Sequence, residues 1–176
     1  PYIQAWFDKI LNFPTHWVYG ENYDNLKYDF QKDYIELHDA LSADCDATDY
    51  DLSAYKAHGG RFILITGSSD SLIPYTDGKN YYENVLKAMG GIDNVTDFFR
   101  YFHVPGLGHG FGGNGLQEIG NLLAMASMNY EREYDALSAM IAWVEEGIAP
   151  EVLYPAAFVD GDMKKEVDFV RPVYPY

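Results

Sequence analysis

The feature that most constrains the fold is the run FILIT at residues 62–66, a continuous stretch of apolar and β-branched residues after a Gly-Gly pair. Such a run is typical of a strand buried on both faces, as in a parallel sheet. A helix is predicted over residues 78–89, with Asp77 as its N-cap, and a second strand over residues 98–104. The order of strand, helix and strand indicates an α/β fold with a doubly wound sheet. Because two strands do not complete such a sheet, we expect an upstream segment or chain to supply the others.

The remaining segments predict a less regular architecture. Short helices are expected over residues 2–11 and 34–42, with an extended loop over residues 13–33 between them. A longer amphipathic helix is expected over residues 133–146, and its buried stripe should consist of Leu137, Met140, Ile141 and Val144. The segment after Pro150 is expected to lie extended over the surface.

Composition and charge exclude several classes of protein. The chain has 176 residues, which is one domain's worth, and 48% of them are hydrophobic, enough for a core. Twelve basic against twenty-seven acidic residues give a formal charge of −15, so nucleic acid and anionic membranes are not expected partners. No apolar stretch approaches the ~18 residues of a membrane helix. The chain shows no leader peptide and starts at Pro1, from which we expect that an upstream piece has been removed or omitted.

The single cysteine, Cys45, cannot form a disulfide within the chain. A buried, inert thiol is the first interpretation. A bond to another chain stays open, because an odd cysteine in a secreted protein suggests either such a bond or a free thiol.

Two residues are candidates for catalysis because each follows a predicted strand. Asp70 lies in the loop after the first strand and His109 in the glycine-rich loop after the second, 109 − 70 = 39 residues later. In an open parallel sheet, ligands bind at the carboxyl ends of the strands. The acid also precedes the histidine, as in the α/β-hydrolase triad, whose chain order is Ser, then Asp or Glu, then His. A carboxylate on Nδ1 orients an imidazole, and Nε2 then takes the proton of the nucleophile.

The nucleophile of such a triad is missing from the chain. Its expected setting is G-x-S-x-G between a strand and a helix. Ser68 and Ser69 lie in the predicted acid loop instead. Ser127 and Ser138 lie in helical sequence, so no serine has the required setting. We therefore expect that the chain does not hydrolyse esters by itself.

Three motifs carry a resemblance to a known family. They are D-L-S-A-x-K-x-x-G-G at residues 51–60, G-x-x-D-x-x-I-P at residues 67–74 and V-P-G-x-G-H at residues 104–109. With these motifs, the stretch from Asp46 to Leu153 resembles the C-terminal region of the tannase and feruloyl esterase family.

The resemblance implies a division of the chain. Residues 1–33 would be the segment that returns from the family's lid domain, and residues 34–176 the C-terminal part of the α/β-hydrolase catalytic domain. The serine, the oxyanion hole and the lid would lie on an N-terminal portion or chain of the same precursor, which is the expected partner. No cofactor is expected, and a structural calcium ion in that lid stays open.

The resemblance also implies an activity. It implies a secreted serine esterase that cleaves esters of gallic, ferulic or related aromatic acids, with Asp70 as the triad acid and His109 as the base. Many members place a cysteine directly after this histidine and bridge it to a cysteine beside the serine. This chain has Gly110 at that place, so that disulfide is not expected.

Other polar residues favour structural roles. His103 lies inside the second predicted strand, and no metal-ligand spacing relates the other histidines, which are His16, His38 and His58. An acidic cluster lacks the glycine and the closing glutamate of a calcium loop and indicates a solvated turn; its members are Asp44, Asp46, Asp49 and Asp51.

Two functions of other kinds stay open. A non-catalytic module that binds carbohydrate or phenolics would fit the 16% of aromatic residues. An α/β-hydrolase of other ester specificity would use the same acid and base. Tyr75, with Tyr81 or Tyr82, is a candidate to line a site for aromatic acids, although packing is the simpler role.

Overall fold

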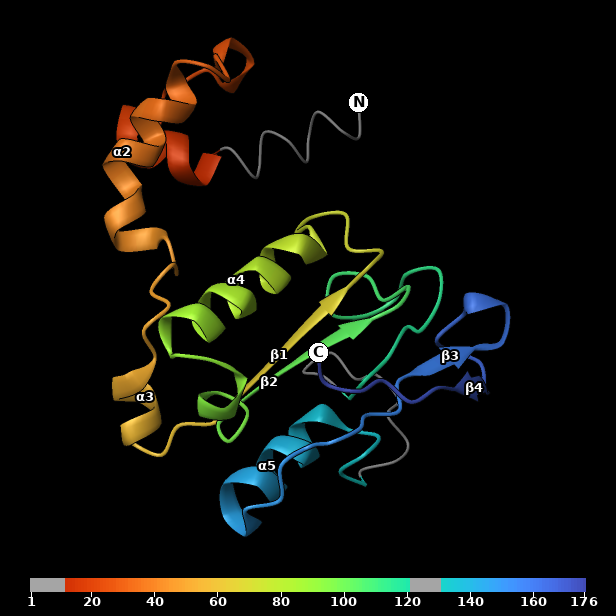
Figure 1. The fold of residues 1–176 in the computed structure, drawn as a ribbon. Coiled ribbons are helices and arrows are strands. Elements are labelled where there is room, and N and C mark those ends of the chain that lie inside the picture. The colour runs from red at the N-terminus through yellow and green to blue at the C-terminus, as the bar shows by residue number, and fades with distance from the viewer. Residues whose placement is uncertain (1–11, 121–130) are drawn as a thin grey trace. The chain divides into compact units, whose positions relative to one another are not determined.

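The computed structural model describes residues 12–120 and 131–176 (Figure 1). The helix expected over residues 2–11 lies outside this part. The chain divides into two compact units, Pro1–Thr48 and Asp49–Tyr176. No helix of the described residues is long and apolar enough to cross a membrane.

The first unit is helical. Residues 12–19 form a helix, η1 spans Asn25–Lys27 and α2 spans Asp33–Cys45. The expected loop over residues 13–33 is therefore wrong at its start. The helix there ends at Gly20, whose φ of 89° gives the left-handed turn that closes a helix. The expectation of a buried thiol is also wrong, because Cys45 is exposed.

Two parallel strands form the centre of the second unit. β1 (Phe62–Gly67) pairs with β2 (Phe99–Val104), from Phe62 opposite Phe99 to Gly67 opposite Val104. The crossover helix α4 (Tyr75–Ala88) begins three residues before the predicted start. Pro74 is its N-cap, and no side chain completes the cap. The predicted N-cap at Asp77 is therefore wrong, and its carboxylate lies in the first turn, where it complements the helix dipole.

Shorter elements connect these. α3 (Ser53–Ala57) precedes β1, and η2 (Ile92–Asn94) lies between α4 and β2. The later chain holds α5 (Ala136–Glu146). Its N-cap is Asp135, whose side-chain carboxylate accepts a hydrogen bond of 2.6 Å from the Ser138 N–H.

The two strands bury side chains on both faces, as the apolar run predicts. One face packs with α4 in a cluster that contains Phe62, Leu64, Phe99, Tyr101, Tyr82 and Val85. The opposite face packs with α5 in a cluster that contains Ile63, Ile65, Phe102, Val104 and Ala139. Figure 1 shows α4 and α5 on either side of β1 and β2. The α/β fold expected from the sequence is thus confirmed.

The buried stripe predicted for α5 is wrong. Its exposed fractions are 56% at Leu137, 46% at Ile141 and 63% at Val144, whereas Trp143 is 3% exposed. Two cations lie over the ring of Trp143, since the guanidinium carbon of Arg61 is 5.9 Å from the ring centroid and that of Arg100 is 5.6 Å from it. The helix has apolar side chains on two faces, and within the chain the face with small alanines beside Trp143 packs inward.

The prediction that the segment after Pro150 lies extended over the surface is wrong for part of that segment. β3 (Ala156–Phe158) and β4 (Val167–Val170) form an antiparallel pair around η3 (Val159–Gly161). Leu153 is fully buried and exchanges two backbone hydrogen bonds with Val173, at 2.9 and 2.8 Å. The N–H of Tyr176 donates to the carbonyl of Tyr101 on β2. These long-range pairings, which no local pattern encodes, bury Leu153, Ala157, Phe158 and Val173, whereas all four residues of β4 are exposed, as expected for a surface segment.

Candidate active site

The turn after β1 fixes the orientation of the Asp70 carboxylate. Oδ1 accepts hydrogen bonds from the backbone N–H of Leu72 at 2.8 Å and of Ile73 at 3.0 Å. Burial acts to raise the pKa of Asp70. The hydrogen bonds that its ionised form accepts, from Ile73, His109 and Leu72, outweigh burial and hold the pKa below its usual range. Asp70 is therefore an ionised, oriented acceptor at neutral pH.

His109 lies at the tip of a short hairpin-like loop after β2, which we call the His loop and define as residues 105–115. Its two arms are bridged by the pair Leu107 and Gly113, and the Asn114 N–H donates to the Gly106 carbonyl at 3.0 Å. The glycines permit this close approach, because a Cβ on Gly113 would lie 2.0 Å from the Gly106 oxygen. The loop therefore presents its tip residue outward.

The two candidate residues meet between the two loops. Nδ1 of His109 lies 2.9 Å from Oδ2 of Asp70. The Asp70 side chain is 11% exposed and the His109 side chain is 58% exposed. A buried carboxylate that binds Nδ1–H holds the imidazole in the tautomer whose Nε2 accepts a proton. The pair is thus arranged as an acid-base dyad, and among the described residues nothing bonds to Nε2.

The loop between β1 and α4, residues 68–74, carries Asp70 and is called the acid loop; it lies against the His loop through backbone contacts. A Cβ on Gly67, at the end of β1, would lie 2.1 Å from the carbonyl oxygen of Leu107. The Ser69 N–H donates to the same oxygen at 3.0 Å. Only glycine at position 67 permits this contact, so the carboxyl end of β1 packs directly against the start of the His loop.

Among the described residues, the serines that lack a nucleophile's setting in the sequence form no hydrogen bond with Nε2. The hydroxyls of Ser68 and Ser69 bond to Gly106 and Asn114 of the His loop. Ser138 lies on the first turn of α5. Ser127 lies outside the described residues. The sequence does not predict these contacts of Ser68 and Ser69 with the His loop. The only signal for them is that both serines directly precede Asp70.

The other histidines make local contacts. His103 stacks near Tyr75 with ring centroids 4.6 Å apart, its Nδ1 lies 3.2 Å from the hydroxyl of Thr66, and burial lowers its pKa. Nδ1 of His58 lies 2.7 Å from the carbonyl of Ala54.

The acidic cluster and the tyrosines also have local partners. Side chains of Asp49 and Asp51 accept hydrogen bonds from backbone N–H groups two residues on, as in solvated turns. Within residues 12–120 and 131–176, no group of three acidic, histidine or cysteine side chains has the arrangement of a metal site. Tyr82 is buried in the core, and the Tyr81 hydroxyl donates to the backbone carbonyl of Asp49. Tyr75 is exposed.

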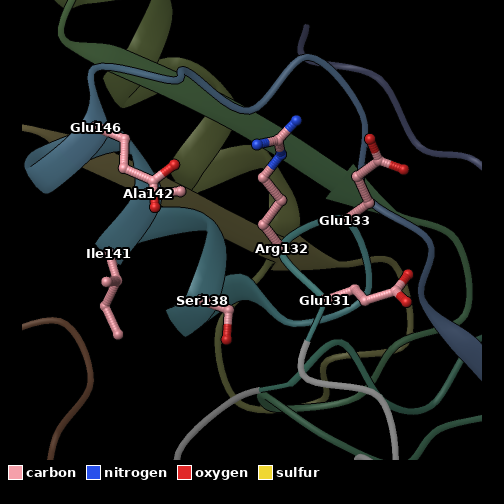
Figure 2. Close-up of a pocket in the computed structure, with 7 residues that line it drawn as sticks. All are labelled: Glu131, Arg132, Glu133, Ser138, Ile141, Ala142 and Glu146. Atoms are coloured by element: carbon pink, nitrogen blue, oxygen red, sulfur yellow. The ribbon is translucent and has the colours of Figure 1, made fainter.

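A separate pocket of ≈ 500 Å³ lies over α5 (Figure 2). Its lining consists of Glu131, Arg132, Glu133, Ser138, Ile141, Ala142 and Glu146. None of these residues belongs to the acid loop or to the His loop, so the pocket is not the site of the dyad.

The fold and the site define the class of protein: an α/β protein with an acid-base pair at the carboxyl ends of two parallel strands. Residues 4–176 match the family described as tannase and feruloyl esterase. The chain belongs to that family.

Comparisons with individual proteins agree with this family. The chain is 37% identical to an uncharacterized esterase of Xanthomonas campestris over 77% of its length and 26% of the relative's. It is 35% identical to a probable feruloyl esterase B-2 of Neosartorya fischeri, over 92% of this chain and 31% of that protein. The crystal structure of an esterase from Aspergillus oryzae superimposes with a TM-score of 0.81 at 30% identity, covering 94% of this chain and 33% of that one. The chain therefore spans about a third or less of the length of these relatives.

Proposed function

We propose that this chain supplies the acid and the base of a serine carboxylic ester hydrolase. The observation that carries the proposal is the 2.9 Å contact between Asp70 Oδ2 and His109 Nδ1 at the ends of adjacent parallel strands. Membership of the tannase and feruloyl esterase family supports the same chemistry.

In the proposed reaction, a serine outside this chain attacks the ester carbonyl. Nε2 of His109 accepts the serine proton as the acyl–oxygen bond to serine forms, and then donates it to the departing alkoxide. Water then gives a proton to the same nitrogen and attacks the acyl carbon. The bond to serine breaks, the serine oxygen takes the proton from Nε2, and the acid is released. Asp70 remains ionised and stabilises the imidazolium that forms in both steps. The lowered pKa of Asp70 supports this role, because the carboxylate keeps its charge when His109 is protonated.

The serine, the oxyanion hole and the lid are proposed to lie on an N-terminal portion or chain of the same precursor. Two observations support this division. The relatives extend to about three times the length that this chain covers. Also, the C-terminal residues bond to β2 through Tyr101, whereas β1 pairs within the described residues with β2 alone. A further parallel strand at β1 would extend the sheet on that side. In this proposal residues 1–33 return from the lid and residues 34–176 complete the catalytic domain.

The proposed substrates are esters of aromatic acids such as ferulic or gallic acid. The name of the N. fischeri relative, a probable feruloyl esterase, supports an aromatic acyl group. A secreted location is proposed on the same family grounds, and no cofactor takes part in the chemistry.

The test uses the intact protein and two simple esters, methyl ferulate and methyl gallate. His109→Ala should lower kcat by about 10⁴-fold or more, because it removes the only proposed base. His58→Ala is the matched control, since that exposed imidazole bonds only to a local carbonyl. A fluorophosphonate probe should label one serine of the intact protein. Near-normal turnover in His109→Ala would remove His109 from the mechanism, and absence of labelling would favour a binding module.

A further inference from the structure

Three consecutive residues of the acid loop contact three different parts of the His loop. Asp70 bonds to the tip residue, His109. The two residues before it, Ser68 and Ser69, each bond to one arm of the same loop. The His loop is therefore held at its tip and at both arms by one short stretch of chain.

Ser68 holds the arm that enters the loop. Its Oγ accepts a hydrogen bond of 2.7 Å from the backbone N–H of Gly106, 38 residues later. The Ser68 N–H also donates to the carbonyl of Val104 at 3.2 Å. Because Gly106 is buried, its N–H would lose its partner if the hydroxyl were removed.

Ser69 holds the arm that leaves the loop. Its hydroxyl donates to Oδ1 of Asn114, 45 residues later. Asn114 in turn connects the arms, because its N–H donates to the carbonyl of Gly106. The two serine hydroxyls thus act on opposite arms at the base of the loop whose tip carries His109.

We propose that Ser68 and Ser69 are positioning residues that hold His109 in bonding geometry with Asp70. The inference rests on the proposed function of the dyad. Gly110 follows His109, so no disulfide joins the loop next to the histidine, and the described contacts that fix the tip and arms to the acid loop are non-covalent. A loop with 58% of its histidine side chain exposed has little packing to hold that side chain otherwise. Ser68 and Ser69 restrain the two arms of the His loop, and Asp70 restrains the imidazole ring of His109.

The test measures kinetics and a spectroscopic signal in the intact protein. Ser68→Ala and Ser69→Ala should each lower kcat for methyl ferulate about tenfold and leave KM within about twofold, because small displacements of a catalytic group cost rate rather than binding. The downfield ¹H resonance of His109 Nδ1–H, which reports the bond to Asp70, should shift or broaden in both variants. Ser69→Thr keeps a hydroxyl and should restore both kcat and the resonance.

A double-mutant cycle separates positioning from a general loss of stability. Asn114→Ala removes the partner of Ser69, so Ser69→Ala should cost little more in that background. Tyr55→Phe is the matched control, since it removes one hydroxyl that donates to the Arg61 carbonyl and contacts neither loop. The proposal is overturned if both alanine variants keep the parent kcat and resonance, or if Tyr55→Phe causes the same loss. Near-normal turnover in His109→Ala would instead refute the proposed function. The His109 resonance in Ser68→Ala and Ser69→Ala would still test whether the two serines position the histidine.

Discussion

Oδ2 of Asp70 lies 2.9 Å from Nδ1 of His109, although 39 positions separate the two residues in the sequence. The other carboxylate oxygen of Asp70, Oδ1, accepts hydrogen bonds from two backbone N–H groups of its own turn. The backbone bonds fix the plane of the carboxylate, and so they also fix the direction from which His109 is held.

Asp70→Asn separates the shape of this residue from its charge. The amide oxygen can still accept from the turn, but its NH₂ group then faces Nδ1 and favours the tautomer in which Nε2 carries the proton. We expect kcat for methyl ferulate to fall by about 10⁴-fold with the fold retained, as such a tautomer change does in other triads. Steady-state kinetics and circular dichroism would check this. Asp77→Asn is the control, and a loss below about tenfold at position 70 would contradict the role of the charge.

Gly67→Ala tests the backbone contact between the two loops. The added Cβ would lie 2.1 Å from the carbonyl oxygen of Leu107, and backbone cannot give way as a flexible side chain can. We expect a destabilisation of about 1–3 kcal/mol or more by overpacking and a loss of the His109–Asp70 bond. Denaturant unfolding and turnover measure the two effects. Gly112→Asn serves as comparison, because a Cβ at Gly112 meets nothing within 4 Å and asparagine tolerates its φ of +65°. Equal effects at the two positions would count against the steric account.

The hydrogen bond from Tyr23 to Asp33 in the first unit predicts a pH dependence. The hydroxyl donates to Asp33 Oδ2 at 2.6 Å, which lowers the pKa of Asp33 and, with burial, raises that of Tyr23 to about 12. For Asp33 the stabilisation is complete above the ordinary carboxyl pKa of about 3.9 and is lost as pH falls through the lowered value. For Tyr23 it is complete below about 10 and is lost as pH rises through about 12.

Tyr23→Phe removes this bond and tests the assignment. The pKa of Asp33, followed by carboxyl ¹³C NMR, should rise toward its ordinary value, and the unit should lose structure at a higher pH during acid titration. Tyr34→Phe is the control, because the exposed Tyr34 lies on the same helix without a bond to Asp33. An unchanged Asp33 titration in Tyr23→Phe would contradict the assignment of the lowered pKa to the Tyr23 bond.

Trp143 and Ile141 distinguish the two apolar faces of α5. Trp143→Ala should destabilise the protein by about 3–5 kcal/mol, because a buried aromatic ring in contact with two guanidinium groups is lost. Ile141→Ala, at a side chain 46% exposed, should change the free energy of unfolding by about 0.5 kcal/mol or less. Chemical denaturation of both variants checks the order. A larger cost at Ile141 than at Trp143 would contradict the observed orientation of the helix.

The parts of the fold that were predictable depend on local sequence. The run at residues 62–66 is apolar at every position but the last, and both faces of β1 do meet helices. The bond between Asp70 and His109 follows from their places after adjacent strands, although the catalytic roles of the two residues stay a proposal. The face of α5 was not predictable, because both faces are apolar and only the tertiary packing of Trp143 selects one of them.

Long-range pairing accounts for the remaining differences. The segment after Pro150 has the prolines of a surface tail, yet Leu153 pairs with Val173 and enters the core. The bonds of Ser68 and Ser69 join residues 38 and 45 positions apart, so no window of sequence contains both partners. Their effect on His109 depends on a register that only the assembled strands define.

The parallel pairing of β1 with β2 also has a consequence for the order of folding events. Phe62 and Phe99, the first partners, are 99 − 62 = 37 residues apart, so the crossover through α4 must close before any ladder bond forms. A slip of one residue would turn every side chain to the other face and displace one loop by about 3.3 Å. We therefore expect the Asp70–His109 bond to form late in refolding, after the register of β1 and β2 is set. Recovery of the His109 Nδ1–H signal would then report when the sheet is complete rather than when the chain collapses.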